Sequence, residues 1–256
     1  MTANLRGLLA RGGTLVAPGA SDALSARLIE AHGYECVYIG SYATAAGRFA
    51  MPDTGLLSLE QLAAQAKTIA DAVRIPVIAD AEGFDNAVPA FEAAGVAAIH
   101  IEDHTGAGKH TNAPQQLHPR EEAAERIRQA VAARRNPDFL IVARSDAFWV
   151  HRDLDDCIAR LELYAKAGAD MVFPTLVGPA ELAEVRRRVA RPVMIVDMPG
   201  RTLAEHAGAA IVLYYAFSIT RQFAALQQAL RSGELASDTA PLEDFLGYKD
   251  GPGRDR

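Results

Sequence analysis

Short apolar runs rich in β-branched residues alternate along the chain with longer stretches in which apolar residues recur at helical spacing. The predicted strands occupy residues 14–18, 36–40, 76–80, 97–103, 139–144, 171–174, 192–197 and 210–215. The predicted helices occupy residues 21–32, 58–73, 86–94, 119–135, 153–167, 178–189, 202–207 and 216–231. Eight strand–helix units without an internal linker predict an α/β fold, a single-domain (β/α)8 TIM barrel over residues 1–250 with a flexible tail at 251–256. A doubly wound open sheet is the alternative, although it usually has fewer units at this length.

Several predicted helices carry sequence signals at their ends. Ser58 and Gln61 have the spacing of a capping box, in which each side chain accepts a hydrogen bond from the other residue's backbone. Gly95 and Gly168 follow the last residues of two helical patterns, where glycine commonly ends a helix. These signals support the boundaries that the hydrophobic pattern predicts.

Composition narrows the class of protein. The 256 residues carry a net charge of -6, which argues against a nucleic-acid or anionic-membrane surface built from clustered Lys and Arg. No stretch approaches the roughly 20 apolar residues of a membrane span, and the N-terminal apolar stretch is too short for a signal peptide. Cys36 and Cys157 form neither a disulfide framework nor a metal-binding spacing, and both are expected in the core. We therefore expect a cytoplasmic protein.

Acidic side chains follow two neighbouring predicted strands. Asp80 and Glu82 end the strand at 76–80, and Glu102 ends the next strand along the chain. In a (β/α)8 barrel the carboxyl ends of the strands carry the active site, so these three carboxylates are expected in a small volume. They would repel one another and shift each other's pKa values unless a cation lay among them. Mg2+ or Mn2+, which prefer oxygen ligands, would supply that cation; the alternative is that each acid caps the following helix.

Six motifs then identify a resemblance: "APGASDALSARLIEAHGYECVYIGSYATAA", "MPDTGLLSLEQ", "PVIADAEGFDN", "GVAAIHIED", "FLIVARSDAF" and "YAKAGADMVFP". Their order and spacing over residues 14–175 resemble the isocitrate lyase/phosphoenolpyruvate mutase superfamily. The resemblance implies a (β/α)8 barrel, usually a tetramer, with the C-terminal eighth helix swapped between subunits. It also implies Mg2+ and a small 2-oxo acid or related carboxylate substrate that reacts through an enolate. A homo-oligomer, dimer or tetramer, is expected.

The resemblance assigns metal ligands at the strand ends. Asp80 matches the direct metal ligand of the family, and Glu82 stands where the family usually has Asp. Glu102 matches a ligand that acts directly or through water. Asp53, in "PDTG", matches an active-site Asp near the metal and the substrate.

Other positions match groups that hold the substrate. Ser41 and the backbone amides of Tyr42 and Ala43 match a loop that binds the substrate carboxylate. Arg144 matches an Arg that binds a substrate carboxylate or oxygen, and its planar fork suits that role. Lys109 falls where the family has the Lys of a mobile gating loop.

The departures from the family pattern concern proton delivery and the metal motif. The segment "DAEGFDN" is one residue shorter than the usual "DADTGYGN", and the loop "TGAGKHTNAP" lacks the Cys that isocitrate and methylisocitrate lyases use as a general acid. Lys109 and Asn112 are one residue off the Lys-x-Asn spacing of phosphoenolpyruvate mutases. Without that Cys, His110, His104 or a metal-bound water must supply the proton, and we expect catalysis to involve His110 with Asp53, Lys109 and Arg144.

Three functions remain open at this stage. The first is a Mg2+-dependent lyase or decarboxylase that cleaves a C–C bond in a small 2-oxo or 2-hydroxy dicarboxylate, with little activity on isocitrate. The second is phosphonate chemistry of the phosphoenolpyruvate mutase or phosphonopyruvate hydrolase type. The third is a barrel that binds a small carboxylate with little catalysis.

Overall fold

Eight parallel strands form two sheets in the computed structural model, which describes residues 4–106, 109–110, 114–198 and 200–248. The order is β1-β8-β7 in one sheet and β2-β3-β4-β5-β6 in the other. The strands are β1 (Leu15–Pro18), β2 (Val37–Ile39), β3 (Val77–Asp80), β4 (Ala98–Glu102), β5 (Leu140–Ser145), β6 (Met171–Pro174), β7 (Met194–Val196) and β8 (Ile211–Tyr214). Each coincides with a predicted strand to within two residues at either end.

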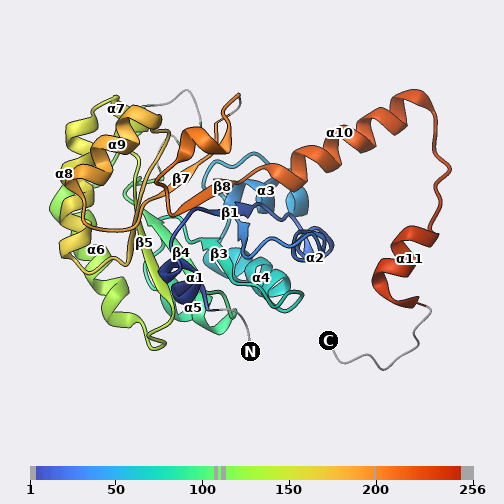
Figure 1. Cartoon of the computed structure of the whole chain (residues 1–256), viewed down its shortest axis with the longest axis horizontal. Coiled ribbons are helices and arrows are strands. Elements are labelled where there is room, and N and C mark those ends of the chain that lie inside the picture. The colour runs from blue at the N-terminus through green and yellow to red at the C-terminus, as the bar shows by residue number, and fades with distance from the viewer. Residues whose placement is uncertain (1–3, 107–108, 111–113, 199, 249–256) are drawn as a thin grey trace. The chain divides into compact units, whose positions relative to one another are not determined.

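Most helices lie between consecutive strands along the chain, whereas α1 precedes β1 and α10 and α11 follow β8 (Figure 1). They are α1 (Leu5–Ala10), α2 (Ala23–Ala31), α3 (Ser41–Phe49), α4 (Leu59–Ala70), α5 (Ala87–Ala93), α6 (Arg120–Ala133), α7 (Ala147–His151), α8 (Leu154–Lys166), α9 (Pro179–Arg188), the 3-10 helix η1 (Leu203–His206), α10 (Phe217–Ser232) and α11 (Ala240–Leu246). The pattern did not predict α1, α3, α7 and α11. These helices have only five to nine residues, too few for a clear helical period.

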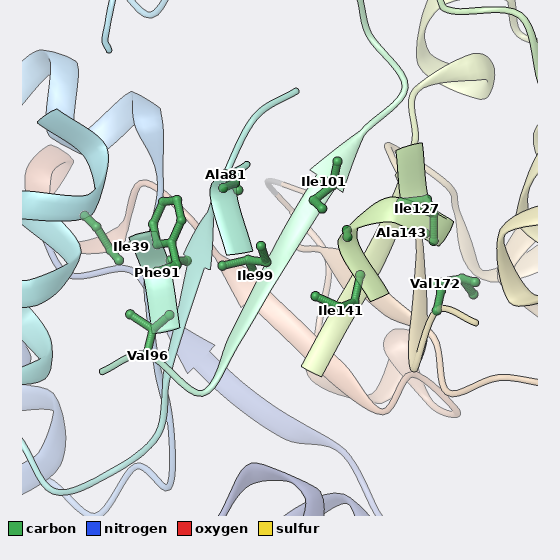
Figure 2. Packing of buried hydrophobic residues seen from close by; sticks show 14 of the residues in the cluster. Ile39, Ala81, Phe91, Val96, Ile99, Ile101, Ile127, Ile141, Ala143 and Val172 are labelled. Atoms are coloured by element: carbon green, nitrogen blue, oxygen red, sulfur yellow. The ribbon is translucent and has the colours of Figure 1, made fainter. Parts of the chain in front are cut away.

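Both faces of the strands are buried, as expected for parallel strands. One set of alternate side chains packs with the helices; Figure 2 shows Phe91 of α5 and Ile127 of α6 among strand residues such as Ile99 and Ile141. The other set forms a second apolar cluster to which all eight strands contribute and which includes Leu5 of α1.

The two sheets are connected at their edges. A single parallel bridge joins Gly19 to Tyr38, next to β1 and within β2, and another joins Val172 of β6 to Val193, next to β7. The helix-end signals behave as predicted: Ser58 and Gln61 form the capping box of α4, and Gly168 adopts a φ of +103° after α8.

The chain divides into two compact units, Met1–Ile219 and Thr220–Arg256. The first unit contains all eight strands. The second contains most of α10 and all of α11, and α10 exposes Phe223, Leu226 and Leu230 at helical spacing. The predicted tail at 251–256 lies outside the described residues. Within the described part of the chain, no helix combines the length and the hydrophobicity that crossing a bilayer requires.

Candidate active site

A cavity of about 610 Å³ opens where β2, β3, β5, β6, β7 and β8 end. This is the edge at which parallel α/β folds place their ligands. The residues that line it are Tyr38, Gly40, Ser41, Tyr42, Ala46, Met51, Pro52, Asp53, Thr54, Asp80, Lys109, His110, Arg144, Trp149, Phe173, Thr175, Leu176, Val196, Leu213 and Tyr215.

Asp80 lies at the floor of this cavity with both carboxylate oxygens engaged. Its Oδ1 accepts a hydrogen bond of 2.8 Å from the backbone N–H of Glu82, and its Oδ2 lies 3.1 Å from Ser41 Oγ. The first of these bonds shapes the turn after β3, in which Glu82 adopts a left-handed φ of +47°. That conformation is strained for a residue with a side chain, and it directs Glu82 back toward the strand ends.

Lys109 lies between the two glutamates. Its Nζ is 3.0 Å from Glu102 Oε1 and 3.2 Å from Glu82 Oε1, and only 2% of its side chain is exposed. The three predicted carboxylates do gather, as the strand ends indicated. The repulsion among them, however, is relieved in this structure by an ammonium group of the chain itself.

The electrostatic environment separates Asp80 from Glu82. Burial opposes ionisation of Asp80, but nearby His100, Lys109 and Arg144 outweigh it and hold the pKa of Asp80 below its usual range. We attribute this to Lys109 and Arg144, because burial lowers the pKa of His100 and favours its neutral form. Burial and the neighbouring carboxylates instead raise the pKa of Glu82 to about 7, with Lys109 acting in the opposite direction.

Arg144 is fixed at the end of β5 by an acidic clamp. Its Nε and Nη2 donate to the two carboxylate oxygens of Asp146 at 2.7 and 3.0 Å, and Nε also donates to Thr175 Oγ1 at 3.1 Å. Its Nη1 lies 3.1 Å from Glu102 Oε2, although this approach does not have hydrogen-bond geometry. The guanidinium is therefore held rigidly while it still lines the cavity.

Asp53 and His110 form a further acid–histidine pair among the residues that line the cavity. Asp53 Oδ2 is 3.1 Å from Ser41 Oγ and 3.5 Å from His110 Nε2. Burial raises the pKa of Asp53 and lowers the pKa of His110, while the interaction between the two groups opposes both shifts. The His110 side chain is 41% exposed, so it can exchange protons with solvent.

Two supporting networks were not assigned to the active site from the sequence, although His100 was expected to be a hydrogen-bonded core residue. Under Asp80, His100 is completely buried; its Nε2 is 3.0 Å from the hydroxyl of Tyr38, and its Nδ1 lies 3.5 Å from Asp80 Oδ1. Behind Arg144, buried Asp103 accepts a 2.8 Å bond from the backbone N–H of Asp146. An aromatic or acidic residue in a strand does not by itself indicate an active-site role, because many such residues only pack in the core or cap a helix.

Other predicted residues have different outcomes. Tyr42 lines the cavity, whereas the side chain of Ala43 is buried away from it. Ser41 begins α3 where a loop was expected, so the predicted amides of Tyr42 and Ala43 belong to the first turn of a helix. Asn112 lies outside the described residues, as do 107–108, 111 and 113 of the predicted gating loop.

The two alternative proton donors and the cysteines are also located. His104 is buried and does not line the cavity; its Nδ1 accepts a 2.8 Å bond from the backbone N–H of Gly106, and its Nε2 lies 3.2 Å from Gln115 Oε1. Cys36 and Cys157 are buried, and burial raises the pKa of each thiol to about 12. Both cysteines are core residues, as predicted.

The donor set suits a hard divalent cation in chemistry. Asp53, Asp80, Glu82 and Glu102 offer oxygen ligands, and the buried Oε2 of Glu102 has no hydrogen bond. The described residues nevertheless contain no group of three or more His, Cys, Asp or Glu side chains positioned as a metal site. In this structure the Lys109 ammonium lies between the oxygens of Glu82 and Glu102.

The sequence of this chain is similar to the sequences of characterised enzymes. The family described as phosphoenolpyruvate phosphomutase matches residues 5–233. A 2,3-dimethylmalate lyase of Eubacterium barkeri is 37% identical over 79% of this chain and 70% of its own length. An isocitrate lyase of Haloferax volcanii is 37% identical over 69% of this chain, but the match spans only 54% of that relative.

Solved structures agree with the sequence relatives. A phosphoenolpyruvate phosphomutase from Streptomyces platensis subsp. rosaceus superposes with a TM-score of 0.87 at 30% identity, covering 97% of this chain and 96% of the other. A phosphonopyruvate hydrolase in complex with oxalate and Mg++ gives a TM-score of 0.85 at 27% identity, covering 98% and 96%.

Proposed function

The chain belongs to the phosphoenolpyruvate phosphomutase family, within the isocitrate lyase/phosphoenolpyruvate mutase superfamily of enzymes, and we propose that it is a carbon–carbon lyase acting on a small 2-oxo or 2-hydroxy dicarboxylate. The observation that carries the proposal is the cavity at the strand ends, where a clamped guanidinium faces a cluster of buried carboxylates. The similarity to a 2,3-dimethylmalate lyase supports the same reaction class.

The substrate carboxylate binds at Arg144. The clamp by Asp146 and Thr175 leaves the guanidinium at the cavity surface in one orientation, so no side-chain freedom is lost when a carboxylate binds. The first turn of α3 lies at the same cavity, and backbone N–H groups at a helix start lack partners within the helix. The amides of Tyr42 and Ala43 are therefore proposed to hold a second oxygen of the substrate.

The remaining cavity wall favours small alkyl substituents. Met51, Phe173, Leu176, Val196 and Leu213 supply an apolar surface. Arg144 and Lys109 are the only Arg and Lys side chains among the described residues that line the cavity, and both are already paired with acids. A third substrate carboxylate, as in isocitrate, would lie against apolar side chains without a cation, which is costly.

Proton transfer is proposed to use His110 and Asp53. Cleavage of the C2–C3 bond of a 2-hydroxy acid transfers the proton of the C2 hydroxyl to a base, for which we propose the Asp53 carboxylate, and leaves an electron pair on C3, which must take up a proton. His110 Nε2 lies beside Asp53 at the cavity, and both cysteines of the chain are buried in the core. His110 is thus the group best placed to deliver the C3 proton.

Asp80, Glu82 and Glu102 are proposed to hold Mg2+ or Mn2+, with Asp53 nearby. Such a cation would supply Lewis-acid polarisation of the substrate's oxygens when bound. The complex of the related phosphonopyruvate hydrolase with oxalate and Mg++ supports this assignment. The role of Asp80 in the chain itself is to present a carboxylate that stays ionised, because nearby cations hold its pKa low.

A closed (β/α)8 barrel is proposed for the strands. The support is the pair of bridges at the two seams between the sheets and the single apolar cluster to which all eight strands contribute. We further propose a homo-oligomer formed through α10, with C-terminal helices swapped between subunits. The exposed apolar face of Phe223, Leu226 and Leu230 would be buried by a second copy of the chain. The expectation of a cytoplasmic protein stays a proposal that rests on composition.

Phosphonate chemistry is the second candidate. Two observations favour it: the matching family is described as phosphoenolpyruvate phosphomutase, and the solved structures include a phosphonopyruvate hydrolase. Among the described residues that line the cavity, each Arg or Lys side chain is already paired with an acid, which argues against a phosphoryl group because it carries more charge than a carboxylate.

A substrate panel separates the candidates. The purified protein with Mg2+ is incubated with 2,3-dimethylmalate, oxaloacetate, 2-methylisocitrate, isocitrate and phosphonopyruvate, and products are identified by NMR. The lyase predicts pyruvate together with a carboxylic acid or CO2, fastest for a dicarboxylate that carries small alkyl substituents or none. Phosphate release or isomerisation of phosphonopyruvate would establish the second candidate. Binding without turnover would indicate a carboxylate-binding barrel. Isocitrate or 2-methylisocitrate as the best substrate, each with three carboxylates, would contradict the cavity argument.

A further inference from the structure

Lys109 makes an unusual set of contacts for a lysine. Its side chain is 2% exposed and its Nζ bridges two buried carboxylates, at 3.0 Å from Glu102 Oε1 and 3.2 Å from Glu82 Oε1. Lysine is strongly hydrated and is seldom buried unless it is paired with acids. The carboxylates of Glu102, Asp80 and Glu82 outweigh burial and raise the pKa of Lys109, so the group is an ammonium ion.

The ammonium stands where oxygen ligands for a metal converge. Glu82 Oε1 and Glu102 Oε1 both point at the same nitrogen, and Asp80 contributes to the same field of negative charge. A divalent cation bound by these oxygens would approach Lys109 Nζ to within a few ångströms in a buried site. Two positive groups at that separation repel strongly where water does not screen them.

We propose that Lys109 is a built-in competitor of the divalent cation, and that metal binding requires its ammonium to leave Glu82 and Glu102. The proposal rests on the metal site of the proposed function. In the metal-free protein Lys109 neutralises the acidic cluster and keeps the strand ends in place. The cation then replaces one positive group with another at the same carboxylates.

The neighbouring residue provides an internal reporter of this exchange. His110 follows Lys109 directly, and its ring centroid is 5.1 Å from that of Trp149 in α7. The chain contains a single Trp. Because withdrawal of Lys109 would move the adjacent histidine, Mg2+ should change the fluorescence of Trp149 in the absence of any substrate.

The exchange is tested by metal binding without turnover. Mn2+ affinity is measured by electron paramagnetic resonance of free Mn2+ for wild type, Lys109→Met, Lys109→Arg and the surface control Lys67→Met, which removes an exposed pair with Asp71. Lys109→Met should bind Mn2+ at least tenfold more tightly than wild type. Lys109→Arg, which keeps the positive charge, and Lys67→Met should show no such gain.

If folded Lys109→Met binds Mn2+ with the wild-type affinity or more weakly, the proposal that Lys109 competes with the cation is wrong, whereas the proposed metal site is unaffected. Absence of Mn2+ binding in both wild type and Lys109→Met would instead overturn the metal site and the competition with it. Should Lys109→Met fail to fold, the wild-type fluorescence titration decides. A saturable change of Trp149 emission on titration with Mg2+, absent in His110→Ala, supports the exchange, and a constant emission contradicts it.

Discussion

Arg144 shows at the scale of one residue how the site combines rigidity with binding. Its bidentate bond to Asp146 and its bond to Thr175 require a planar guanidinium, which a lysine ammonium cannot reproduce. We predict that Arg144→Lys lowers kcat/KM by about 100-fold, equivalent to roughly 2.7 kcal/mol of transition-state stabilisation. Steady-state kinetics on the best substrate of the panel measures the loss. Arg128→Lys, at an exposed ion pair with Glu125, is the matched control, and a twofold or smaller effect at Arg144 would make that residue structural.

Glu82 should make stability depend on pH in a defined direction. Its pKa in the folded protein, about 7, lies above its ordinary value of 4.5, so it ionises first in the unfolded chain. The free energy of unfolding therefore falls as pH rises from about 4.5 to about 7. Glu82→Gln removes this loss. The free energy of unfolding of Glu82→Gln, measured relative to wild type, should therefore increase by up to about 3 kcal/mol between pH 4.5 and pH 8.

Urea unfolding with EDTA present, at pH 4.5 and pH 8, measures that gain. Glu234→Gln, at an exposed position in the second unit, is the control and should show no pH-dependent difference from wild type. A difference between Glu82→Gln and wild type that is equal at the two pH values would show that the pKa of Glu82 is not raised.

Single residues of the site were predictable where strand ends carried charge. Asp80 and Glu102 end their strands and Arg144 is the second-last residue of β5, so an apolar run followed by an ionisable side chain located all three, and the family resemblance supplied their roles. The partners that hold them were not predictable. Thr175 and Asp146 become significant only because β5 and β6 pair side by side and bring them to 2.5 Å from each other.

At the scale of elements, the capping box of α4 offers a direct test of local sequence signals. Ser58 Oγ accepts a hydrogen bond from the backbone N–H of Gln61 at 3.3 Å, and the Gln61 side chain accepts one from Ser58 at 2.8 Å. We predict that Ser58→Ala lowers the free energy of unfolding by about 1 kcal/mol and leaves kcat/KM unchanged. Chemical denaturation measures the loss. The control is Thr68→Ala, at an exposed position of the same helix without a capping role, and it should not destabilise the protein. Equal losses in the two variants would show that the capping box does not stabilise the helix.

Helices and strands were predictable where their hydrophobic pattern was clear. All eight strands were found because each is a short apolar run, buried on both faces, between turn residues. The helix α3 was not found because the family resemblance assigned Ser41 and the residues after it to a loop that holds the substrate carboxylate. This omission affects the site, since α3 begins at Ser41 and presents its first turn to the cavity.

At the scale of the whole molecule, the exposed face of α10 predicts self-association. Leu226 and Leu230 are 63% and 62% exposed on one side of the helix. We predict that Leu226→Glu combined with Leu230→Glu reduces the mass of the native assembly, as measured by light scattering after size-exclusion chromatography. Gln228→Glu, which adds a charge at another exposed position of α10, should leave the mass unchanged. A wild-type monomer, or a double variant with the wild-type mass, would show that this face does not assemble the protein.

The proposed lyase depends on a divalent cation held by Asp80, and one measurement tests that claim most directly. Initial rates of pyruvate formation from the best carbon substrate of the panel are compared for wild type with Mg2+, wild type with EDTA, and Asp80→Ala with Mg2+. We predict a rate at least 100-fold lower in both of the latter samples, with Asp80→Ala still folded because Asp80 lies at a strand end and outside the two apolar clusters. Pyruvate formation at the wild-type rate in EDTA or in Asp80→Ala would contradict the account.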